Sequence, residues 1–174
     1  MRPFRAFAAA LMLAAPLSAQ RTRGVIVVPG QVTRVVNDTM GSPYPVPFPP
    51  ASVYKALLAT YAELKLPIEF QDSLEFRVGT EVFHRQGQLG GRQISTYLGC
   101  GDGMTGPYAD SYRVYMYVMS TVVPDGERSI LRTAFVAGAR AFGEGAGRDA
   151  MPCETTGRLE VRIHQMVLTR AAGL

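Results

Sequence analysis

The sequence predicts an α+β fold: an antiparallel β-sheet with two amphipathic helices packed on one face and one disulfide. Two long runs of β-branched and aromatic residues flank an Asp-Gly turn at 125–126, which predicts a long β-hairpin. Two segments with apolar residues at helical spacing, one before and one after this hairpin, predict the helices. Two cysteines in a chain predicted to be exported, Cys100 and Cys153, predict the disulfide.

The first 19 residues predict a secretory signal peptide. Arg2 and Arg5 supply positive charge, and residues 6–17 form an apolar run that is too short to span a bilayer. Small residues precede a predicted cleavage between Ala19 and Gln20. Gln20 also stands where a bacterial lipoprotein would carry its lipidated cysteine. We therefore expect an exported mature chain, periplasmic or extracellular, without a lipid anchor.

The composition excludes several classes of partner. Removing Arg2 and Arg5 leaves 16 basic residues of the original 18 against 14 acidic ones, a net charge of +2. No basic cluster predicts nucleic-acid binding, and no further apolar stretch predicts a membrane span. We divide the chain into the signal peptide (1–19), N-terminal strands with a proline-rich arm (20–50) and an α+β domain (51–174).

The N-terminal part of the mature chain predicts extended structure. Residues 24–36 contain two β-branched runs split by Pro29-Gly30, a turn signal between two short strands. Residues 41–50 contain five prolines and cannot join the interior of a sheet. They predict a stiff polyproline connector, with a ligand for a proline-binding module as the alternative.

Both helices carry an apolar stripe. The first is predicted at about residues 51–65, with Pro50 at its start, Ser52 as its cap and Pro67 beyond its end. Its stripe consists of Val53, Leu57, Tyr61 and Leu64, with Tyr54 and Leu58 beside them. The second lies within 154–174, capped by Thr155 or Thr156. Its core-facing residues are predicted to be Leu159, Ile163, Met166 and Val167.

Two hairpins follow from the strand pattern. In residues 67–79 a three-residue loop at 72–74 would pair Phe70 with Phe76 on one face. In the long hairpin, a turn centred on Asp125-Gly126 would pair residue 124 with residue 127, so that the numbers of any two paired residues sum to 251. Its core face then collects Val114, Met116, Val118, Val122, Leu131, Phe135, Ala137 and Ala139.

The opposite face of the long hairpin is the predicted binding surface. It carries Arg113, Tyr115, Tyr117, Arg132 and Arg140, which we call the Tyr/Arg face. Tyrosine and arginine are enriched at protein interfaces because they combine apolar area with hydrogen bonding. The alternative is that the second helix or the N-terminal strands cover this face.

A glycine pattern in 99–106 looks like a dinucleotide fingerprint, G-x-G-x-x-G, at Gly101, Gly103 and Gly106. That fold needs a helix directly after the glycines, whereas Pro107-Tyr108 lead toward a strand. The loop is therefore predicted to be a turn stapled by the disulfide, and no cofactor is expected.

Few residues suggest catalysis or metal binding. Neither His84 nor His164 lies in a nucleophile motif, which favours a disulfide over a reactive cysteine, and neither G-x-S-x-G nor H-E-x-x-H occurs. The disulfide would bring together two glycine-rich loops whose carboxylates could serve as calcium ligands or, on a weaker hypothesis, in a hydrolase. They are Asp102, Asp110, Glu144 and Asp149. Their spacing is not that of an EF-hand loop, so we predict solvated turn carboxylates and no metal.

One stretch resembles a known family. Residues 53–76, VYKALLATYAELKLPIEFQDSLEF, run as a helix, a break and a returning strand, and resemble the helix-grip domains of the outer-membrane assembly lipoprotein BamC. The chain also has the general character of an exported bacterial family. The resemblance implies an accessory role in an envelope complex. Gln20 and the disulfide depart from that family, and no functional residue is transferred from it.

These observations predict a non-enzymatic exported interaction module that binds a protein through the Tyr/Arg face. The alternative is a domain that binds a small hydrophobic ligand in a cavity between helices and sheet. Met116, Phe135 and Tyr61 would line that cavity.

Overall fold

The computed structural model describes residues 23–36, 41–141 and 150–173. The predicted signal peptide and its cleavage between Ala19 and Gln20 lie outside these ranges.

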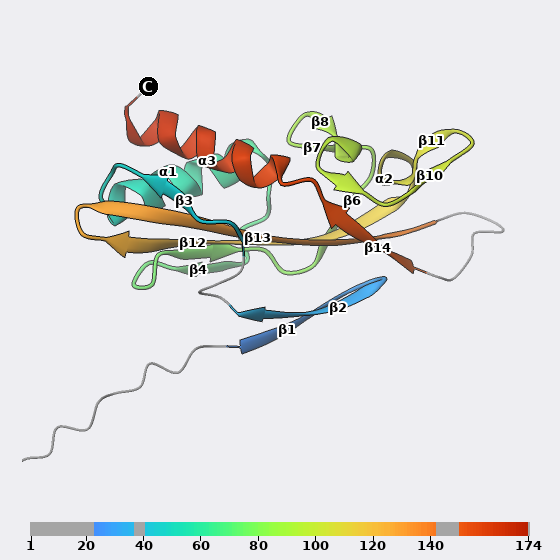
Figure 1. Cartoon of the computed structure of the whole chain (residues 1–174), viewed down its shortest axis with the longest axis horizontal. Helices are drawn as coiled ribbons and strands as arrows, with labels where there is room; N and C mark the ends of the chain where they lie inside the picture. The colour runs from blue at the N-terminus through green and yellow to red at the C-terminus, as the bar shows by residue number, and fades with distance from the viewer. Residues whose placement is uncertain (1–22, 37–40, 142–149, 174) are drawn as a thin grey trace, which may run out of the picture.

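An eight-stranded antiparallel sheet forms the centre of the protein (Figure 1). Its middle is the long hairpin of β12 (Arg113–Asp125) and β13 (Arg128–Arg140). Strands β5 and β6 pair with successive parts of β12, and β3 and β14 pair with successive parts of β13. The strands around the hairpin are β3 (Tyr44–Val46), β4 (Phe70–Asp72), β5 (Arg77–Gly79), β6 (Phe83–Arg85), β9 (Leu98–Gly99) and β14 (Ala150–Thr155).

Smaller elements connect and cover the sheet. The N-terminal strands β1 (Arg23–Val28) and β2 (Gln31–Val36) form a two-stranded hairpin around Pro29-Gly30, as predicted. We call it the N-terminal ribbon. The other short elements are β7 (Gln88–Leu89), β8 (Arg92–Gln93), the 3₁₀ turn η1 (Ile94–Thr96), β10 (Asp102–Gly103), β11 (Gly106–Pro107) and α2 (Tyr108–Ser111).

The long hairpin confirms the predicted core face but not the predicted register. Paired residues sum to 253, with Val118 opposite Phe135, so the two-residue loop is Gly126-Glu127. Gly126 has a φ of +62°, which suits glycine at the first loop position of a tight hairpin. The error of two residues keeps every side chain on its predicted face, because faces alternate with a period of two. All eight residues of that face are buried.

Helix α1 (Pro50–Glu63) buries the predicted stripe. Val53, Leu57 and Tyr61 are completely buried. The predicted cap is wrong: Ser52 is exposed, and Pro49 precedes the helix without a side-chain cap bond. Proline at the first helical position costs no hydrogen bond there, because that N–H has no partner within a helix.

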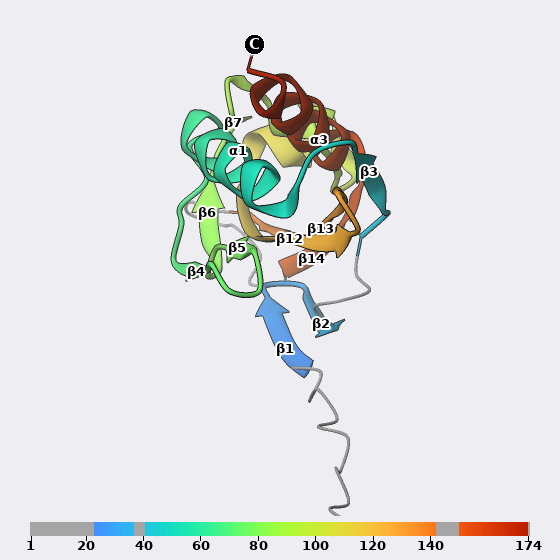
Figure 2. The ribbon, with the colours of Figure 1, turned by 90° about the vertical axis from the view of Figure 1, so that its left-hand side faces the viewer.

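Helix α3 (Arg158–Ala171) follows Gly157 and buries Leu159, Ile163 and Val167, as predicted. Helices α1 and α3 contact each other, and α1 contacts β12 while α3 contacts β13. Figure 2 shows both helices above the sheet and the N-terminal ribbon below it.

A buried polar chain links α1 to the hairpin. The hydroxyl oxygens of Tyr61 and Ser120 lie 3.0 Å apart, and those of Ser120 and Thr133 lie 2.8 Å apart. All three side chains are at most 2% exposed, and burial raises the pKa of the Tyr61 hydroxyl above its ordinary value. These hydroxyls satisfy one another in an otherwise apolar layer, which fixes how α1 sits on the sheet.

The β4–β5 hairpin corrects the second predicted register. Phe70 pairs with Gly79, and Asp72 pairs with Arg77, around a four-residue loop at 73–76. The prediction that Phe70 pairs with Phe76 is wrong, because the Asp72 carboxylate accepts the N–H groups of residues 74 and 75, each at 3.0 Å. These bonds build a side-chain-stabilised turn that the alternation of apolar residues does not reveal.

The same contacts make stability depend on pH. The backbone N–H of Glu75 is the largest cause that lowers the pKa of Asp72, helped by Leu74 and Arg77 and opposed by desolvation. The pKa is therefore lower in the folded chain than the unfolded value of about 3.9. The contribution to stability is complete above the unfolded pKa and is lost as the pH falls through the folded pKa. An NMR titration of the Asp72 carboxyl should show a midpoint below that of an unfolded peptide; a midpoint at or above it contradicts the assignment.

Candidate functional site

The N-terminal ribbon covers the middle of the predicted Tyr/Arg face. Tyr117 and Val136 are only 8% and 6% exposed and pack against Val28 of β1, which is 1% exposed. Burial raises the pKa of the Tyr117 hydroxyl, which lies 3.4 Å from the sulfur of Met119. The prediction that Tyr117 belongs to an open binding surface is therefore wrong. At this residue the alternative holds, because the N-terminal strands bury it.

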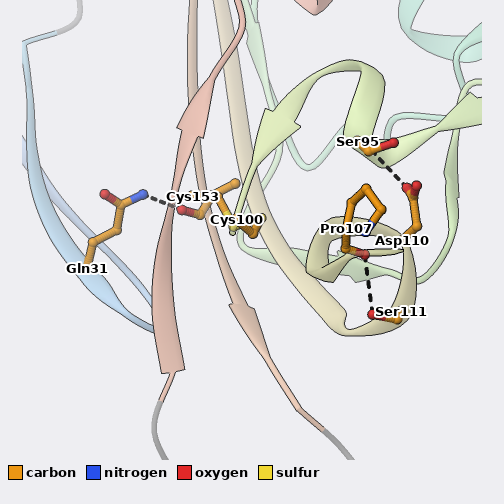
Figure 3. The surroundings of a disulfide bond; sticks show 8 residues. Gln31, Ser95, Cys100, Pro107, Asp110, Ser111 and Cys153 are labelled. Carbon is orange, nitrogen blue, oxygen red and sulfur yellow. Dashed lines mark hydrogen bonds between the residues drawn. A yellow bond between two sulfur atoms is a disulfide. The ribbon is translucent and has the colours of Figure 1, made fainter. Parts of the chain in front are cut away.

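Two contacts hold the ribbon on the sheet. The side-chain amide of Gln31 donates a hydrogen bond to the carbonyl oxygen of Ala137 (Figure 3). Beside it, the carbonyl oxygen of Pro29 approaches Gly138 so closely that a Cβ there would lie 1.7 Å from this oxygen. The turn of the ribbon can therefore contact the sheet only because residue 138 has no side chain.

The remaining residues of the Tyr/Arg face lie on either side of the covered pair Tyr117 and Val136, with Arg132 toward the turn and the others toward the far end of the hairpin. Arg132 is half-buried and donates a hydrogen bond to the carbonyl oxygen of Gly41 at 3.1 Å. Tyr115 is half-buried beside the ring of His84, with ring centroids 5.8 Å apart. Arg113 and Arg140 are exposed and pair at the far end of the hairpin. The five predicted residues therefore do not form one continuous open surface.

The exposed apolar surface lies instead on the outer side of the ribbon. Val25, Val27 and Val32 are 62%, 61% and 69% exposed. Val27 pairs with Val32, and Val25 lies two residues from Val27 on the same strand, so the three side chains share one face. We call this face the valine patch. Sequence reasoning missed it because alternation alone does not tell which side of a ribbon faces the sheet.

The predicted disulfide joins Cys100 and Cys153 (Figure 3). Both residues are about 95% buried, so the bond lies within the core. Next to it β9 pairs with β14, with Gly99 opposite Glu154. The disulfide therefore fastens the segment around residues 94–111 to the edge of the sheet. Disulfides are typical of proteins in oxidising compartments.

The glycine loop after Cys100 forms a small hairpin of β10 and β11. The single turn α2 follows this hairpin. Tyr108 therefore begins a short helix, whereas we predicted that the chain would continue directly into a strand. Tyr108 stacks on Tyr112, with ring centroids 4.5 Å apart. The loop is closed by its own side chains and by the disulfide.

The carboxylates that we considered as metal ligands do not come together in one site within the described residues. Asp110 accepts the backbone N–H of Ser95 at 2.9 Å, and Asp102 is exposed on β10. Glu144 and Asp149 lie outside the described residues. Within the described ranges, no group of three or more histidine, cysteine, aspartate or glutamate side chains could hold a metal ion.

The two histidines pack against aromatic rings. His84 lies beside Tyr115 on the sheet. His164 stacks on Tyr44, with centroids 4.9 Å apart, and its Nε2 lies 3.2 Å from the carbonyl oxygen of Pro45. His164 therefore connects α3 to β3, the strand that the proline-rich arm adds to the edge of the sheet.

The residues of the alternative ligand cavity lie in the core. Tyr61 and Met116 are completely buried and Phe135 is 7% exposed, all within one apolar cluster. Three pockets on the surface of the described part of the chain are lined by other residues. The alternative therefore gains no specific observation in its favour.

No helix in the described ranges is long and apolar enough to cross a membrane. Comparisons of this chain with protein-family models, curated proteins and solved structures found no match.

Proposed function

We propose that this protein is a non-enzymatic, exported interaction module that docks onto an envelope protein through the valine patch. The observation that carries this proposal is the exposure of three adjacent valines, at 61–69%, on a ribbon whose inner side is already buried. Contiguous exposed apolar side chains on a folded domain mark interaction surfaces more often than isolated ones do.

The energetic argument favours an apolar partner surface. Complete burial of a valine side chain contributes about 1.5 kcal/mol or more. Covering the three valines of the patch, each more than half exposed, therefore contributes a few kcal/mol. A patch of this size supplies the centre of an interface, with affinity completed by the polar residues around it. The ribbon's backbone edges could extend the contact by strand pairing.

The N-terminal sequence supports export. Cleavage between Ala19 and Gln20 would leave the valine patch only a few residues from the mature N-terminus. The Cys100–Cys153 disulfide fits the oxidising compartment to which such a leader directs a protein. We further propose the helix-grip arrangement, α1 and α3 on one face of the sheet, supported by the contacts between these helices.

A photo-cross-linking experiment in the native envelope tests the docking surface. A photoreactive amino acid at Val27 should give discrete adducts with a different envelope protein. The same residue at Glu127, exposed at the turn of the long hairpin, should give none. The variant Val25→Thr, with the probe still at Val27, should give fewer adducts, because a hydroxyl replaces a methyl group in the interface.

Three outcomes would contradict the proposal. They are the absence of adducts at Val27, equal adducts at Val27 and Glu127, and adducts only between two copies of this chain.

A further inference from the structure

We infer that a pocket at the start of α3 binds a phosphate monoester dianion. The pocket is an open depression of about 580 Å³ between β3, the β8–η1 segment and the first turns of α3. The lining residues on which the inference depends are Tyr44, Arg92, Thr96, Gly157, Arg158 and Arg162.

The charge of the pocket is the main observation. Three arginines line it and no aspartate or glutamate does. None of the three forms an ion pair within the described part of the chain. Arg158 and Arg162 lie one turn apart on the same helix face, a spacing at which like charges repel. A bound anion would offset this repulsion, and the planar guanidinium group matches two phosphate oxygens at once.

Hydrogen bonds within the fold position the pocket walls before any ligand arrives. The guanidinium of Arg162 donates a hydrogen bond to the hydroxyl of Tyr97, which is 1% exposed. The hydroxyl of Thr156 lies 3.0 Å from the carbonyl oxygen of Thr96, which ties η1 to the start of α3. Such preorganisation lowers the entropic cost of binding.

The helix itself adds positive potential. Gly157 precedes α3 in a left-handed conformation, and the hydroxyl of Thr156 accepts the backbone N–H of Arg158 at 3.4 Å. The first turn of this 14-residue helix also presents the positive end of the helix dipole. Glu160, the acidic residue of this turn, is buried, accepts a hydrogen bond from Thr155 at 2.9 Å and does not line the pocket.

Size and charge define the class of ligand. A phosphate group has five heavy atoms and needs roughly 150 Å³ if each occupies the share of a water molecule, about 30 Å³. The pocket therefore has room for an organic group, and Tyr44, stacked on His164, forms an aromatic wall beside it. Three positive charges favour a dianion over a monoanion of the same shape.

This inference does not depend on the proposed function. Residues of α3 and of the β8–η1 segment line the pocket, whereas the N-terminal ribbon lies across the sheet from α3 (Figure 1). Either proposal can fail while the other stands.

Calorimetric titration at low salt and pH 7.5 tests the inference with phenyl phosphate, a dianion, and phenyl sulfate, a monoanion of nearly the same shape. Phenyl phosphate should bind saturably and more tightly than phenyl sulfate. The double variant Arg92→Gln/Arg158→Gln should weaken its binding by about tenfold or more per removed arginine. Arg162 is left in place because it bonds to Tyr97.

The matched control is Arg128→Gln, an exposed arginine beside the turn of the long hairpin, which should bind phenyl phosphate as the unmodified protein does. Circular dichroism confirms that each variant is folded. No saturable binding of phenyl phosphate, equal affinity for phenyl sulfate, or unchanged binding by the double variant would each overturn the inference.

Discussion

Replacing both Cys100 and Cys153 with alanine is expected to lower the free energy of unfolding by about 2–5 kcal/mol, the usual effect of removing a native disulfide from a small exported domain. The two cysteines are 53 residues apart, so the bond restricts a long loop of the unfolded chain. Urea denaturation should show the loss as a lower midpoint. The midpoint temperature of thermal unfolding should fall by roughly 5–15 °C.

Two controls separate the covalent bond from the effect of the substitutions. Reduction of the unmodified protein should destabilise it by a similar amount and raise its mass by about two daltons. Hydrogen exchange in the double variant should increase most in residues 94–111, because the bond fastens this segment to β14. An unchanged urea midpoint would contradict the stabilising role of the disulfide.

The variant Gly138→Ala is expected to release the N-terminal ribbon from the sheet. A Cβ at this position would lie 1.7 Å from the carbonyl oxygen of Pro29, a separation that no packed structure tolerates. Displacing the ribbon would expose Val28, Tyr117 and Val136, each of which contributes on the order of 1.5–3 kcal/mol when fully buried. The effect should be local, because most of the core lies on the other face of the sheet.

Hydrogen exchange and tyrosine titration measure this release. Amide protons of residues 23–36 should lose protection, and the pKa of Tyr117 should fall toward that of an exposed tyrosine. Gly99→Ala is the matched control, because a Cβ there meets no atom within 4 Å and the backbone is not in the left-handed region. Equal protection of the ribbon in both variants would contradict the role of Gly138.

Local patterns were sufficient for the elements whose partners lie nearby in the chain. The apolar stripe of α1 and the two faces of the long hairpin were predictable, because helical and strand periodicities show directly which side chains are buried together. The disulfide followed from there being two cysteines. The hairpin registers were less predictable, since they depend on which residue accepts φ near +60°, as Gly126 does, or on turn bonds such as those of Asp72.

The candidate sites depended on contacts between distant segments. The sequence named Tyr117 as part of an open surface, but whether that surface is open is decided by Val28, about 90 residues earlier, which packs on it. Likewise, the sequence shows that Arg158 and Arg162 are one helical turn apart, but no local sequence pattern predicts that Arg92 lines the same pocket.

The sequence by itself therefore determined the α+β class, the buried faces and the disulfide of this protein. Only the tertiary structure decided which faces remain exposed, because exposure depends on which distant segment packs on each face. Hydrophobic burial is non-directional: many surfaces could cover the same apolar strand. The close approach of Pro29 to Gly138, and the meeting of β8 with α3, select one of them.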